Sequence, residues 1–468
     1  MKRFVCMMLL LLALAPPAMA RAADPNQVLR IGLAYGSSAV SSVTLSCAGG
    51  FSLGAMNGTT FSAAASTAAT SVTVTASGGA VTVSDSAGTA LYTGQGQAAL
   101  RAGSGRITYA GNEYNGDFVL TSEGSSLTVL NYVGLDDYVK GVLPYEMSAS
   151  WPVEALKAQA LCARSYALGN LGKHESYGFD LCSTTNCQVY RGVSQSTENS
   201  DAAVDQTAGQ TLMADGELAV GYFFSSDGGA TESNENVWGG TPISYLRGVV
   251  DPYEDYQSAS NGVWSVTLTA DEVASALQSA GYAIGTVADV QVTGRTDTGN
   301  VNQVTVTDTA GQTAVLQNSA VRSVFGLNSI RYTINGVGST DPSGGTDTPE
   351  QPDGQTGQVY VNGAAQDDGE YYAVGGDGTS SAIGAASGKT ALTASGQETI
   401  DLGTSAQTRT AASNTPTARA SGTYTFDGTG WGHSVGMSQY GALAMAQQGF
   451  NYEQIVQFYF TGVLVVSG

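Results

Sequence analysis

Between residues 28 and 134 the chain consists of short runs in which apolar or β-branched residues alternate with polar ones. The runs include "SVTLS", "SVTVTA", "AVTVSD" and "SLTVLNYV", and Gly, Ser and Asn separate them. Alternation with a period of two is typical of strands that bury one face, and the separating residues favour turns. We therefore expect an N-terminal all-β region over residues 28–134.

The pattern changes to a helical period from Val153 onward. Apolar residues recur at three- and four-residue steps on one face, at Leu156, Ala160, Ala163, Ala167 and Leu171. Ser150 suits the N-cap, and Pro152 suits the first turn, where a missing N–H matters little. Glu146 is then expected outside this helix, on the turn that leads into it.

Further along, residues 174–192 have no sustained period and are expected to form an ordered loop, and a short polar helix is predicted near 196–208. Residues 261–334 combine a Thr-x-x-Glu capping box at Thr269 with a predicted hairpin in "ADVQVTGRTDTGNVNQVTVTD". This stretch is expected to form an α+β region.

From residue 335 to 422 the composition shifts to Gly, Ser, Thr, Asp and Pro, which indicates a flexible or loosely folded insertion. Residues 423–468 then combine a glycine-rich loop with two short helical patterns, and we assign them with residues 135–260 to one core. The predicted fold class is α+β, with a β-rich core, a central helix, short C-terminal helices and a Gly/Ser-rich insertion.

The N-terminus has the pattern of a secretory signal peptide, assigned to residues 1–20. Lys2 and Arg3 form a basic segment, an apolar run follows from Phe4 to Ala15, and Ala18-Met19-Ala20 resembles a cleavage site. We expect a secreted or cell-wall protein, with an uncleaved N-terminal anchor as the alternative. No other stretch approaches the length of a membrane span.

The charge balance excludes one class of partner. The chain has 18 basic and 39 acidic residues, a formal net charge of −21. Nucleic-acid binding requires a basic face, so nucleic acid is not an expected partner. Outside the signal segment four cysteines remain, Cys47, Cys162, Cys182 and Cys187, and in an oxidising compartment they could form two disulfides.

His174, Cys182 and Cys187 have the spacing His-x7-Cys-x4-Cys. Imidazole and thiolate are the ligands that zinc prefers, and three of them leave a fourth position open. The spacing matches no common zinc-finger pattern. From the residues alone, a zinc site and a Cys182–Cys187 disulfide stay equally open.

Two glycine-rich loops are candidate binding elements. "GTGWGHSVGMSQYGA" lacks the Gly-Lys-Ser/Thr end of a nucleotide loop, but its glycines let backbone N–H groups approach a ligand, and Trp431 could stack on a sugar face. A tight turn into a helix near Ala442 is the alternative. The loop from Ser225 to Glu232 has the same ambiguity.

Four ordered motifs resemble the stage II sporulation protein D family, whose relatives include the amidase enhancers. They are "LDDYVKGVLPYEMSASWPVEALKAQALCARSYAL", "FDLCSTTNCQVYRG", "FFSSDGGATESNENVWG" and "GTGWGHSVGMSQYGALAMAQQG". The resemblance runs from Leu29 to Ile334 and resumes at Tyr424. It implies an exported lytic transglycosylase that cuts peptidoglycan glycan strands, preferring strands without stem peptides, in sporulation or wall turnover.

The family's catalytic glutamate corresponds to Glu146 in "LPYEM". A lytic transglycosylase needs one carboxyl group, which protonates the leaving oxygen and then takes a proton from the 6-hydroxyl of the same sugar. Burial against Pro144, Met147 or Trp151 would keep that carboxyl group partly protonated near neutral pH. The motifs also imply substrate contacts at Tyr190, Ser225, Ser226, Gly228, Gly229, Thr231, Trp431, His433, Ser438 and Gln439.

The resemblance also implies a zinc ion at His174, Cys182 and Cys187, since some members bind zinc in this segment. Three departures are visible: family members usually carry a glycine where this chain has Ser434, a proline at Ser148, and alanine or valine at Cys162. None of them removes a proposed catalytic group.

Two other classes of function are weighed beside the enzyme. A non-catalytic wall-binding modulator that activates a partner amidase, as the enhancer name implies, would not need Glu146. An inert surface or spore-coat protein would account for the composition but not for the ordered motifs. The presence of Glu146 favours the enzyme, with glycan strands as its substrate.

Overall fold

The computed structural model describes residues 27–336 and 422–467, together with six short strands between residues 359 and 399. The signal peptide expected at residues 1–20 lies outside this range. Within the described residues, no helix combines the length and the apolar character needed to cross a membrane. The fold is a β-rich α+β fold, as the sequence predicts.

Residues 28–134 form the predicted all-β region as two sheets that pack face to face, and residues 181–182 add one edge strand, β13. The larger sheet has the order β13-β1-β12-β11-β8-β3-β4, and the smaller β10-β9-β2-β5-β6-β7. Inward-facing residues such as Val43, Leu45, Val72 and Val74 are buried between them, so the alternation read from the sequence does mark the core face. The strands are β1 (Val28–Ala34), β2 (Ser42–Ser46), β3 (Phe51–Asn57), β4 (Thr60–Thr67), β5 (Ser71–Ser77), β6 (Ala80–Ser84), β7 (Ala90–Gln95), β8 (Gln97–Ala102), β9 (Ile107–Tyr109), β10 (Asn112–Tyr114), β11 (Asp117–Glu123), β12 (Ser126–Gly134) and β13 (Leu181–Cys182).

A helical core follows, centred on α2 (Val153–Gly169), the helix that the periodicity predicts. Most of α2 is buried because other helices and a small sheet surround it. Its N-cap is Pro152 and not Ser150, and Leu171 lies beyond its end and is exposed. The elements around it are α1 (Leu135–Glu146), α3 (Glu198–Gln206), α7 (Gln439–Gln447), α8 (Tyr452–Tyr459), β14 (Gln210–Ala214), β15 (Glu217–Leu218) and β30 (Leu464–Ser467).

Glu146 lies outside α2, as expected, but it is the last residue of α1 and does not lie on a turn. Pro144 sits inside the last turn of α1, where it cannot donate to the carbonyl of Lys140. The hydroxyl of Ser196 donates to that carbonyl instead, at 3.1 Å. A contact from a distant segment therefore satisfies the carbonyl that the proline leaves without an intrahelical partner.

In the unit formed by the α+β region, the capping box at Thr269 and the β18–β19 hairpin both form as predicted. Strand β28 (Thr423–Thr429) lies between β17 and β21 in one sheet, so the start of the C-terminal segment belongs to this unit and not to the helical core. The other elements are β17 (Val263–Thr269), α5 (Ala270–Ser279), β18 (Val287–Arg295), β19 (Val301–Asp308), β20 (Thr313–Gln317), α6 (Ala320–Ser323) and β21 (Arg331–Gly336).

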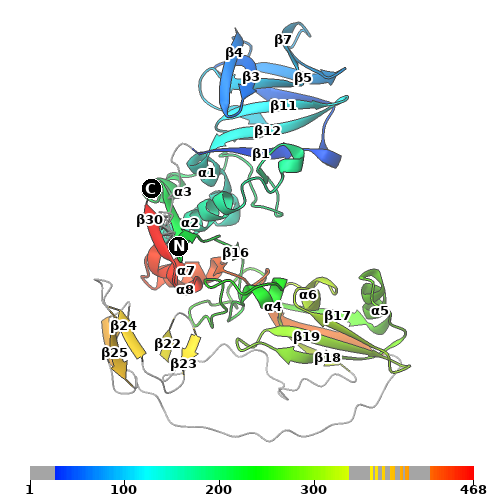
Figure 1. Cartoon of the computed structure of the whole chain (residues 1–468), viewed down its shortest axis with the longest axis vertical. Helices are drawn as coiled ribbons and strands as arrows, with labels where there is room; N and C mark the ends of the chain where they lie inside the picture. The colour runs from blue at the N-terminus through cyan, green and yellow to red at the C-terminus, as the bar shows by residue number, and fades with distance from the viewer. Residues whose placement is uncertain are drawn as a thin grey trace, which may run out of the picture.

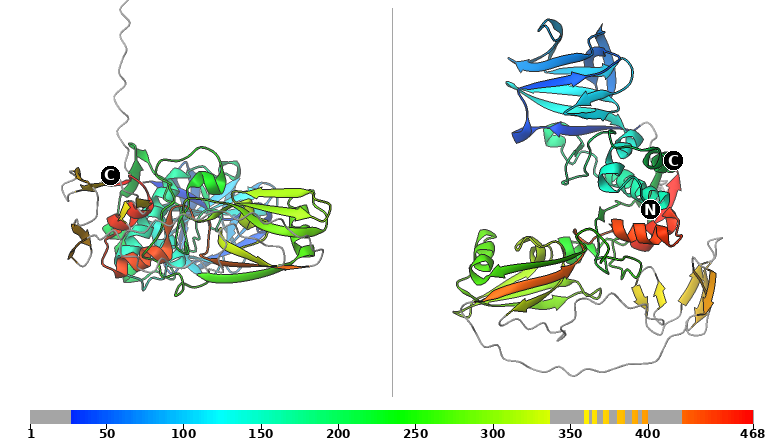
Figure 2. Two further views of the ribbon diagram at one scale, coloured as in Figure 1. Left: turned by 90° about the horizontal axis from the view of Figure 1, so that it is seen from below. Right: turned by 180° about the vertical axis from the view of Figure 1, so that it is seen from behind.

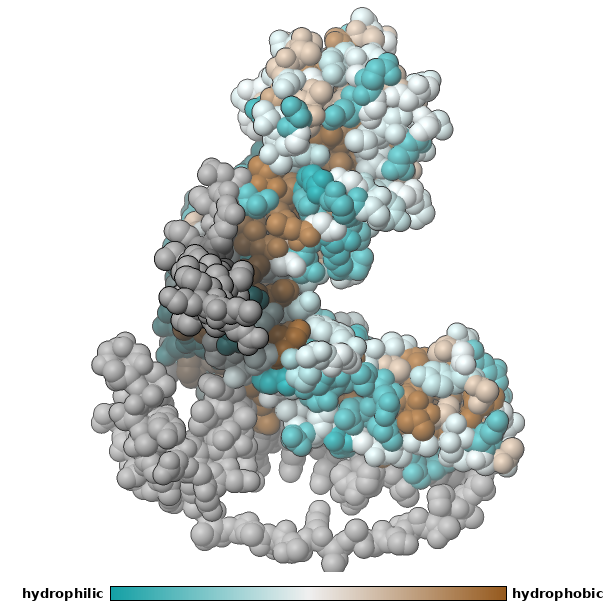
Figure 3. Space-filling view, in the orientation of Figure 1, coloured by the Kyte–Doolittle hydropathy of each residue, from teal (hydrophilic) through white to brown (hydrophobic). Residues whose placement is uncertain are grey.

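The three parts follow one another in space. Figure 1 shows the two-sheet region at one end, the helices in the middle and the α+β unit at the other end, and Figure 2 shows the same order from behind. The space-filling view is hollowed on one side between the two ends, at the level of the helices (Figure 3). The middle of the molecule therefore faces an open recess.

The insertion expected at residues 335–422 connects two strands that pair with each other. β21 and β28 run antiparallel, and Gly336 is the partner of Tyr424 at the point where the chain departs and returns. Most of the insertion lies outside the described residues. Its described strands pair as three hairpins, β22 (Val359–Val361) with β23 (Ala364–Gln366), β24 (Tyr371–Val374) with β25 (Ser380–Gly384), and β26 (Thr390–Thr393) with β27 (Gly396–Thr399).

Replacing residues 337–422 by a two-residue Asn-Gly turn is expected to preserve folding and leave the thermal midpoint unchanged or slightly raised. Gly336 and Tyr424 are already opposite one another, and each halving of a flexible loop lowers its closure free energy by about 0.6 kcal/mol. Circular dichroism and thermal melting of the deletion variant test this. A variant that does not fold would show that the segment is an integral part of the core.

Candidate active site and metal centre

A cleft of about 440 Å³ opens at the junction of the helical core and the glycine-rich loops. Five of the residues expected from the sequence line it: Glu146, Ser225, Trp431, His433 and Gln439. They come from segments up to 293 positions apart in the chain. The cleft also contains Cys187, one of the expected metal ligands.

The carboxyl group of Glu146 is held by two contacts at the C-terminus of α1. The backbone N–H of Val189 donates to Oε1 at 2.9 Å, and Nε2 of Gln439 lies 3.5 Å from Oε2. Burial raises the pKa of Glu146 above its ordinary value, although both contacts act in the opposite direction. A raised pKa is the direction that a general acid requires. Trp151 does not line the cleft and packs against Tyr440.

Two short strand pairings bring the two glycine-rich loops together at the cleft. β16 (Phe223–Phe224) pairs with β29 (Met437–Ser438), and Ser226 forms a bridge with Trp431 through hydrogen bonds of 2.7 and 3.0 Å. Between these pairings the backbone of Gly432 passes so near Phe224 that an added Cβ would lie 2.7 Å from its side chain. Trp431 stays 40% exposed at the rim, where its ring is available to a ligand.

His433 forms part of an aromatic wall of the cleft. Its Nδ1 accepts a hydrogen bond from the backbone N–H of Val435 at 3.1 Å, and its ring lies 5.3 Å from that of Phe224 and 5.4 Å from that of Trp238. Burial lowers the pKa of His433 to about 4. The imidazole is therefore neutral at physiological pH and shapes the wall without adding charge.

Ser434 adopts a backbone conformation that suits glycine. Its φ is +65°, and its side chain is 1% exposed with no hydrogen-bond partner for Oγ among the described residues. A non-glycine residue is strained in this left-handed region, and a buried unpaired hydroxyl is unfavourable. This chain therefore holds its glycine-rich loop in a less stable form than a glycine would allow.

Substituting Ser434→Gly is expected to raise the free energy of unfolding by about 1 kcal/mol. Relief of the strain and of the unpaired hydroxyl outweighs the greater freedom of glycine in the unfolded chain. The matched control is Ser329→Gly, because the Ser329 hydroxyl is also buried but donates to the carbonyl of Thr429 at 2.6 Å. Urea denaturation should show a higher free energy of unfolding for Ser434→Gly and a lower one for Ser329→Gly. A loss of stability in Ser434→Gly would contradict this account.

The other expected substrate residues do not line the cleft. Tyr190 is 1% exposed, and its hydroxyl donates to Oδ1 of Asn131 at 2.6 Å. Gly228 is packed against the backbone of Thr429, and Thr231 is buried where its hydroxyl oxygen accepts from the N–H of Val249. Buried residues cannot contact a substrate directly, so these motif residues support the loops that carry the site.

Ser226, Ser438 and Gly229 surround a buried group of three carboxyls. The hydroxyls of Ser226 and Ser438 donate to Glu254, and the N–H of Gly229 donates to Asp227. Glu254, Asp227 and Asp251 have ligand atoms within 4.8 Å of one another, and burial, together with the nearby charge of Asp251, raises the pKa of Glu254 to about 7. This group ties the two glycine-rich loops together behind the cleft.

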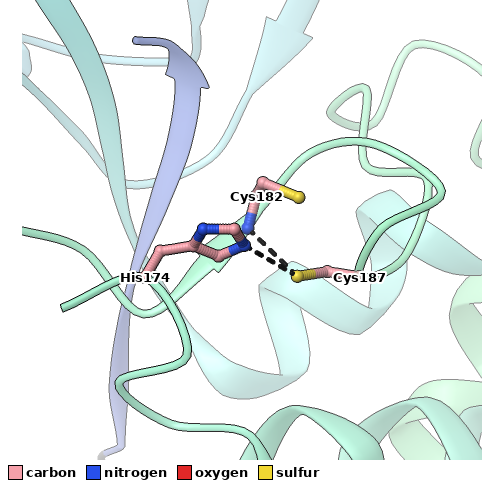
Figure 4. A group of neighbouring side chains, drawn as sticks. All are labelled: His174, Cys182 and Cys187. Atoms are coloured by element: carbon pink, nitrogen blue, oxygen red, sulfur yellow. Dashed lines mark hydrogen bonds between the residues drawn. The ribbon is translucent and has the colours of Figure 1, made fainter. Parts of the chain in front are cut away.

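The expected metal ligands form a compact cluster beside the cleft (Figure 4). Ligand atoms of His174, Cys182 and Cys187 lie within 4.8 Å of one another, and Sγ of Cys187 is 3.4 Å from Nε2 of His174. Tetrahedral zinc, with bonds of about 2.3 Å to sulfur and about 2.0 Å to nitrogen, separates such atoms by roughly 3.5 Å. Cys182 favours the thiolate form, because a hydrogen bond from Cys187 lowers the pKa of Cys182 to about 4. The donor set therefore fits zinc.

No disulfide is formed among the described cysteines. Cys182 and Cys187 are free, and so are Cys47 and Cys162, both of which are buried. The cluster is anchored to the two-sheet region, because Cys182 lies in β13 opposite Gly32 of β1. It therefore stands where that region joins the helical core.

Several residues of the cleft were not identified from the sequence. Trp238, which ends α4 (Asn234–Trp238), is 42% exposed, and its ring packs against that of Tyr222 in a tilted arrangement with 4.8 Å between centroids. Trp238 belongs to the motif "FFSSDGGATESNENVWG" and Tyr222 directly precedes it, so the aromatic residues of this stretch are a usable signal. Lys173 and Asn186 also line the cleft, but only the fold of the loop around the metal cluster brings them there.

Comparison with known proteins gives one family match and several relatives. Residues 123–213 match the model of the family described as "Stage II sporulation protein". An uncharacterised protein of Brachyspira hyodysenteriae is 41% identical over 144 residues, 31% of this chain and 39% of that protein. The amidase enhancer of Bacillus subtilis (strain 168) is 28% identical over 368 residues, 78% of this chain and 45% of its own length. The stage II sporulation protein D of the same organism is 30% identical over 224 residues, 44% and 62% respectively.

In each of these three pairs the match spans less than two thirds of the relative's own length. The family match includes Glu146 and all three residues of the metal cluster. The alignment with the amidase enhancer is long enough to extend well beyond that region.

Proposed function

Because this chain belongs to the stage II sporulation protein D family, we propose that it is an extracytoplasmic lytic transglycosylase. Its substrate is the glycan strand of peptidoglycan, with preference for strands that have lost their stem peptides. The names of the relatives support a role at the cell wall in sporulation or wall turnover.

The observation that carries the proposal is the position of Glu146. Among the described residues lining the cleft it is the one carboxylic acid, and burial raises its pKa. Hydrolases that use two carboxyl groups place both of them around the scissile bond. A cleft with one carboxyl group favours a reaction in which the substrate supplies its own nucleophile.

In this reaction protonated Glu146 donates its proton to the glycosidic oxygen, and the bond from that oxygen to C1 breaks. The carboxylate then accepts the proton of the 6-hydroxyl as that oxygen bonds to C1 of the same sugar. The products are a shortened strand and a 1,6-anhydro end, and Glu146 is protonated again. The N–H of Val189 and the side chain of Gln439 orient the carboxyl group, while the exposed rings of Trp431 and Trp238 offer flat surfaces to the sugars.

A zinc ion at His174, Cys182 and Cys187 would act as a structural brace in this proposal. It would fix the loop carrying Asn186 and Cys187, both of which line the cleft, to strand β13. Structural zinc contributes folding free energy directly.

A second candidate function is activation of a wall amidase without cleavage. The observation that favours it is the alignment of 78% of this chain with a protein named amidase enhancer. The two functions are separated by incubating purified protein with peptide-free glycan strands and analysing the products by mass spectrometry. Products with 1,6-anhydro ends support the enzyme. Intact strands, together with faster cleavage by an added amidase, support the modulator.

A further inference from the structure

Lys173 differs from the other lysines that the structure describes. Lys140 forms an ion pair with Asp205 and Lys157 forms one with Glu154, both at 2.7 Å. The salt bridges of the described residues do not include Lys173, although it lines the cleft together with Glu146. It is also the one basic side chain in that lining, since His433 is neutral.

The ammonium group of Lys173 is held in place by neutral partners. It donates to the carbonyl of Asn186 and to the hydroxyl of Tyr166, the latter at 3.3 Å, and all three residues line the cleft. An ammonium group has three N–H donors, so one remains for a ligand. Both partners are uncharged, so these two hydrogen bonds do not neutralise the ammonium group. The cleft therefore presents an oriented cation to whatever enters it.

The net negative charge of the chain gives the ammonium group of Lys173 a special role toward anionic ligands. The chain has a formal net charge of −21, so an anionic polymer is repelled by most of its surface. A peptide-free peptidoglycan strand is such a polymer, because every second sugar carries a lactyl group that ends in a free carboxylate. When a stem peptide is attached, the same carboxyl carbon forms an amide and has no charge.

We propose that Lys173 binds the free lactyl carboxylate of a muramoyl residue and so determines the preference for peptide-free strands. The inference rests on the proposed function, because it assigns the specificity of the same cleft. It also narrows the substrate class: strands whose sugars lack the lactyl carboxylate are bound less well than muramic acid strands. Lys173 would thus make removal of the peptide by an amidase a requirement for tight binding.

The test measures binding in a Glu146→Gln background, in which strands stay intact. One probe is a peptide-free glycan strand, and the second is the same strand with its carboxyl groups reduced to alcohols. The Glu146→Gln protein is expected to bind the first probe about tenfold more tightly than the second. This ratio is the effect of one charge-assisted hydrogen bond. Adding Lys173→Met should lower affinity for the first probe to that for the second, whereas Lys173→Arg should keep the preference.

Lys140→Met is the matched control, because it removes an equal charge outside the cleft and should keep the preference. Equal binding of both probes by Glu146→Gln, no measurable binding of either, or a preference that persists in Lys173→Met would each overturn the proposal. A different result would show that the proposed transglycosylase function is wrong. Wild-type protein would then release no 1,6-anhydro products, while the binding preference and its dependence on Lys173 would still be measurable.

Discussion

The substitution Glu146→Gln is expected to abolish release of 1,6-anhydro products while leaving the fold intact. An amide can neither protonate the glycosidic oxygen nor accept the proton of the 6-hydroxyl, and both steps are assigned to this one side chain. Loss of general acid–base catalysis reduces rates by about a hundredfold to ten-thousandfold. Gln retains an oxygen for the N–H of Val189, so the thermal midpoint should change little.

The activity is measured by mass spectrometry of products from peptide-free strands. Glu217→Gln is the matched control, because Glu217 is exposed on β15, outside the cleft lining, and the same change there should have no effect. If Glu146→Gln released 1,6-anhydro products at more than a few per cent of the wild-type rate, another group would have to supply the proton.

The same assignment predicts the direction of the pH dependence. The reaction begins with protonated Glu146, and burial raises the pKa of this group above its ordinary value. The value of kcat/KM should therefore be highest at mildly acidic pH and fall as pH rises through that pKa. A profile that instead rises across this range would identify a base, and not an acid, as the limiting group.

Purified under mildly reducing conditions, the protein is expected to contain one zinc per chain, and Cys182→Ser is expected to lose it. The serine hydroxyl does not ionise at neutral pH, so the cluster would keep only two ligands, His174 and Cys187. Loss of the metal should also lower the thermal midpoint, because metal binding contributes to folding. Elemental analysis and thermal melting measure the two effects.

The control for the zinc experiment is Cys47→Ser. Cys47 is also buried and its thiol donates to the carbonyl of Ser104, a bond that a hydroxyl can also make, so this variant should keep its zinc. Metal-free protein whose mass is two hydrogens low within the Cys182–Cys187 peptide would decide against zinc and for the disulfide.

Local patterns predicted the elements of this fold well where each element depends on its own residues. The alternation over residues 28–134, the period of α2 and the capping box at Thr269 each encode burial or hydrogen bonding within a short stretch, and each prediction is confirmed. Helix α1 is not among the predicted elements, and the carbonyl that Pro144 leaves unpaired in its last turn accepts from Ser196, 52 positions away from the proline. β28 was misassigned because its neighbours in the sheet come from a different part of the chain.

The site was predictable to the level of motifs but not of individual side chains. The motifs include Glu146, Trp431 and Gln439, which line the cleft. They do not distinguish these from Tyr190 and Ser438, which are buried and support the loops, since both kinds occur side by side in the same motif. No sequence motif marks Lys173, and its position in the cleft depends on the fold of the loop around the metal cluster.

The junction between β21 and β28 also determines how the protein would respond to tension. Gly336 and Tyr424 are paired, so the two ends of the intervening segment are held about 5 Å apart. A pull on that segment would reach β21 and β28 together, from the same end and in the same direction along both strands. The hydrogen bonds between these two strands would therefore carry little of the load. The resistance would come from the hydrogen bonds of β28 with β17 on its other side.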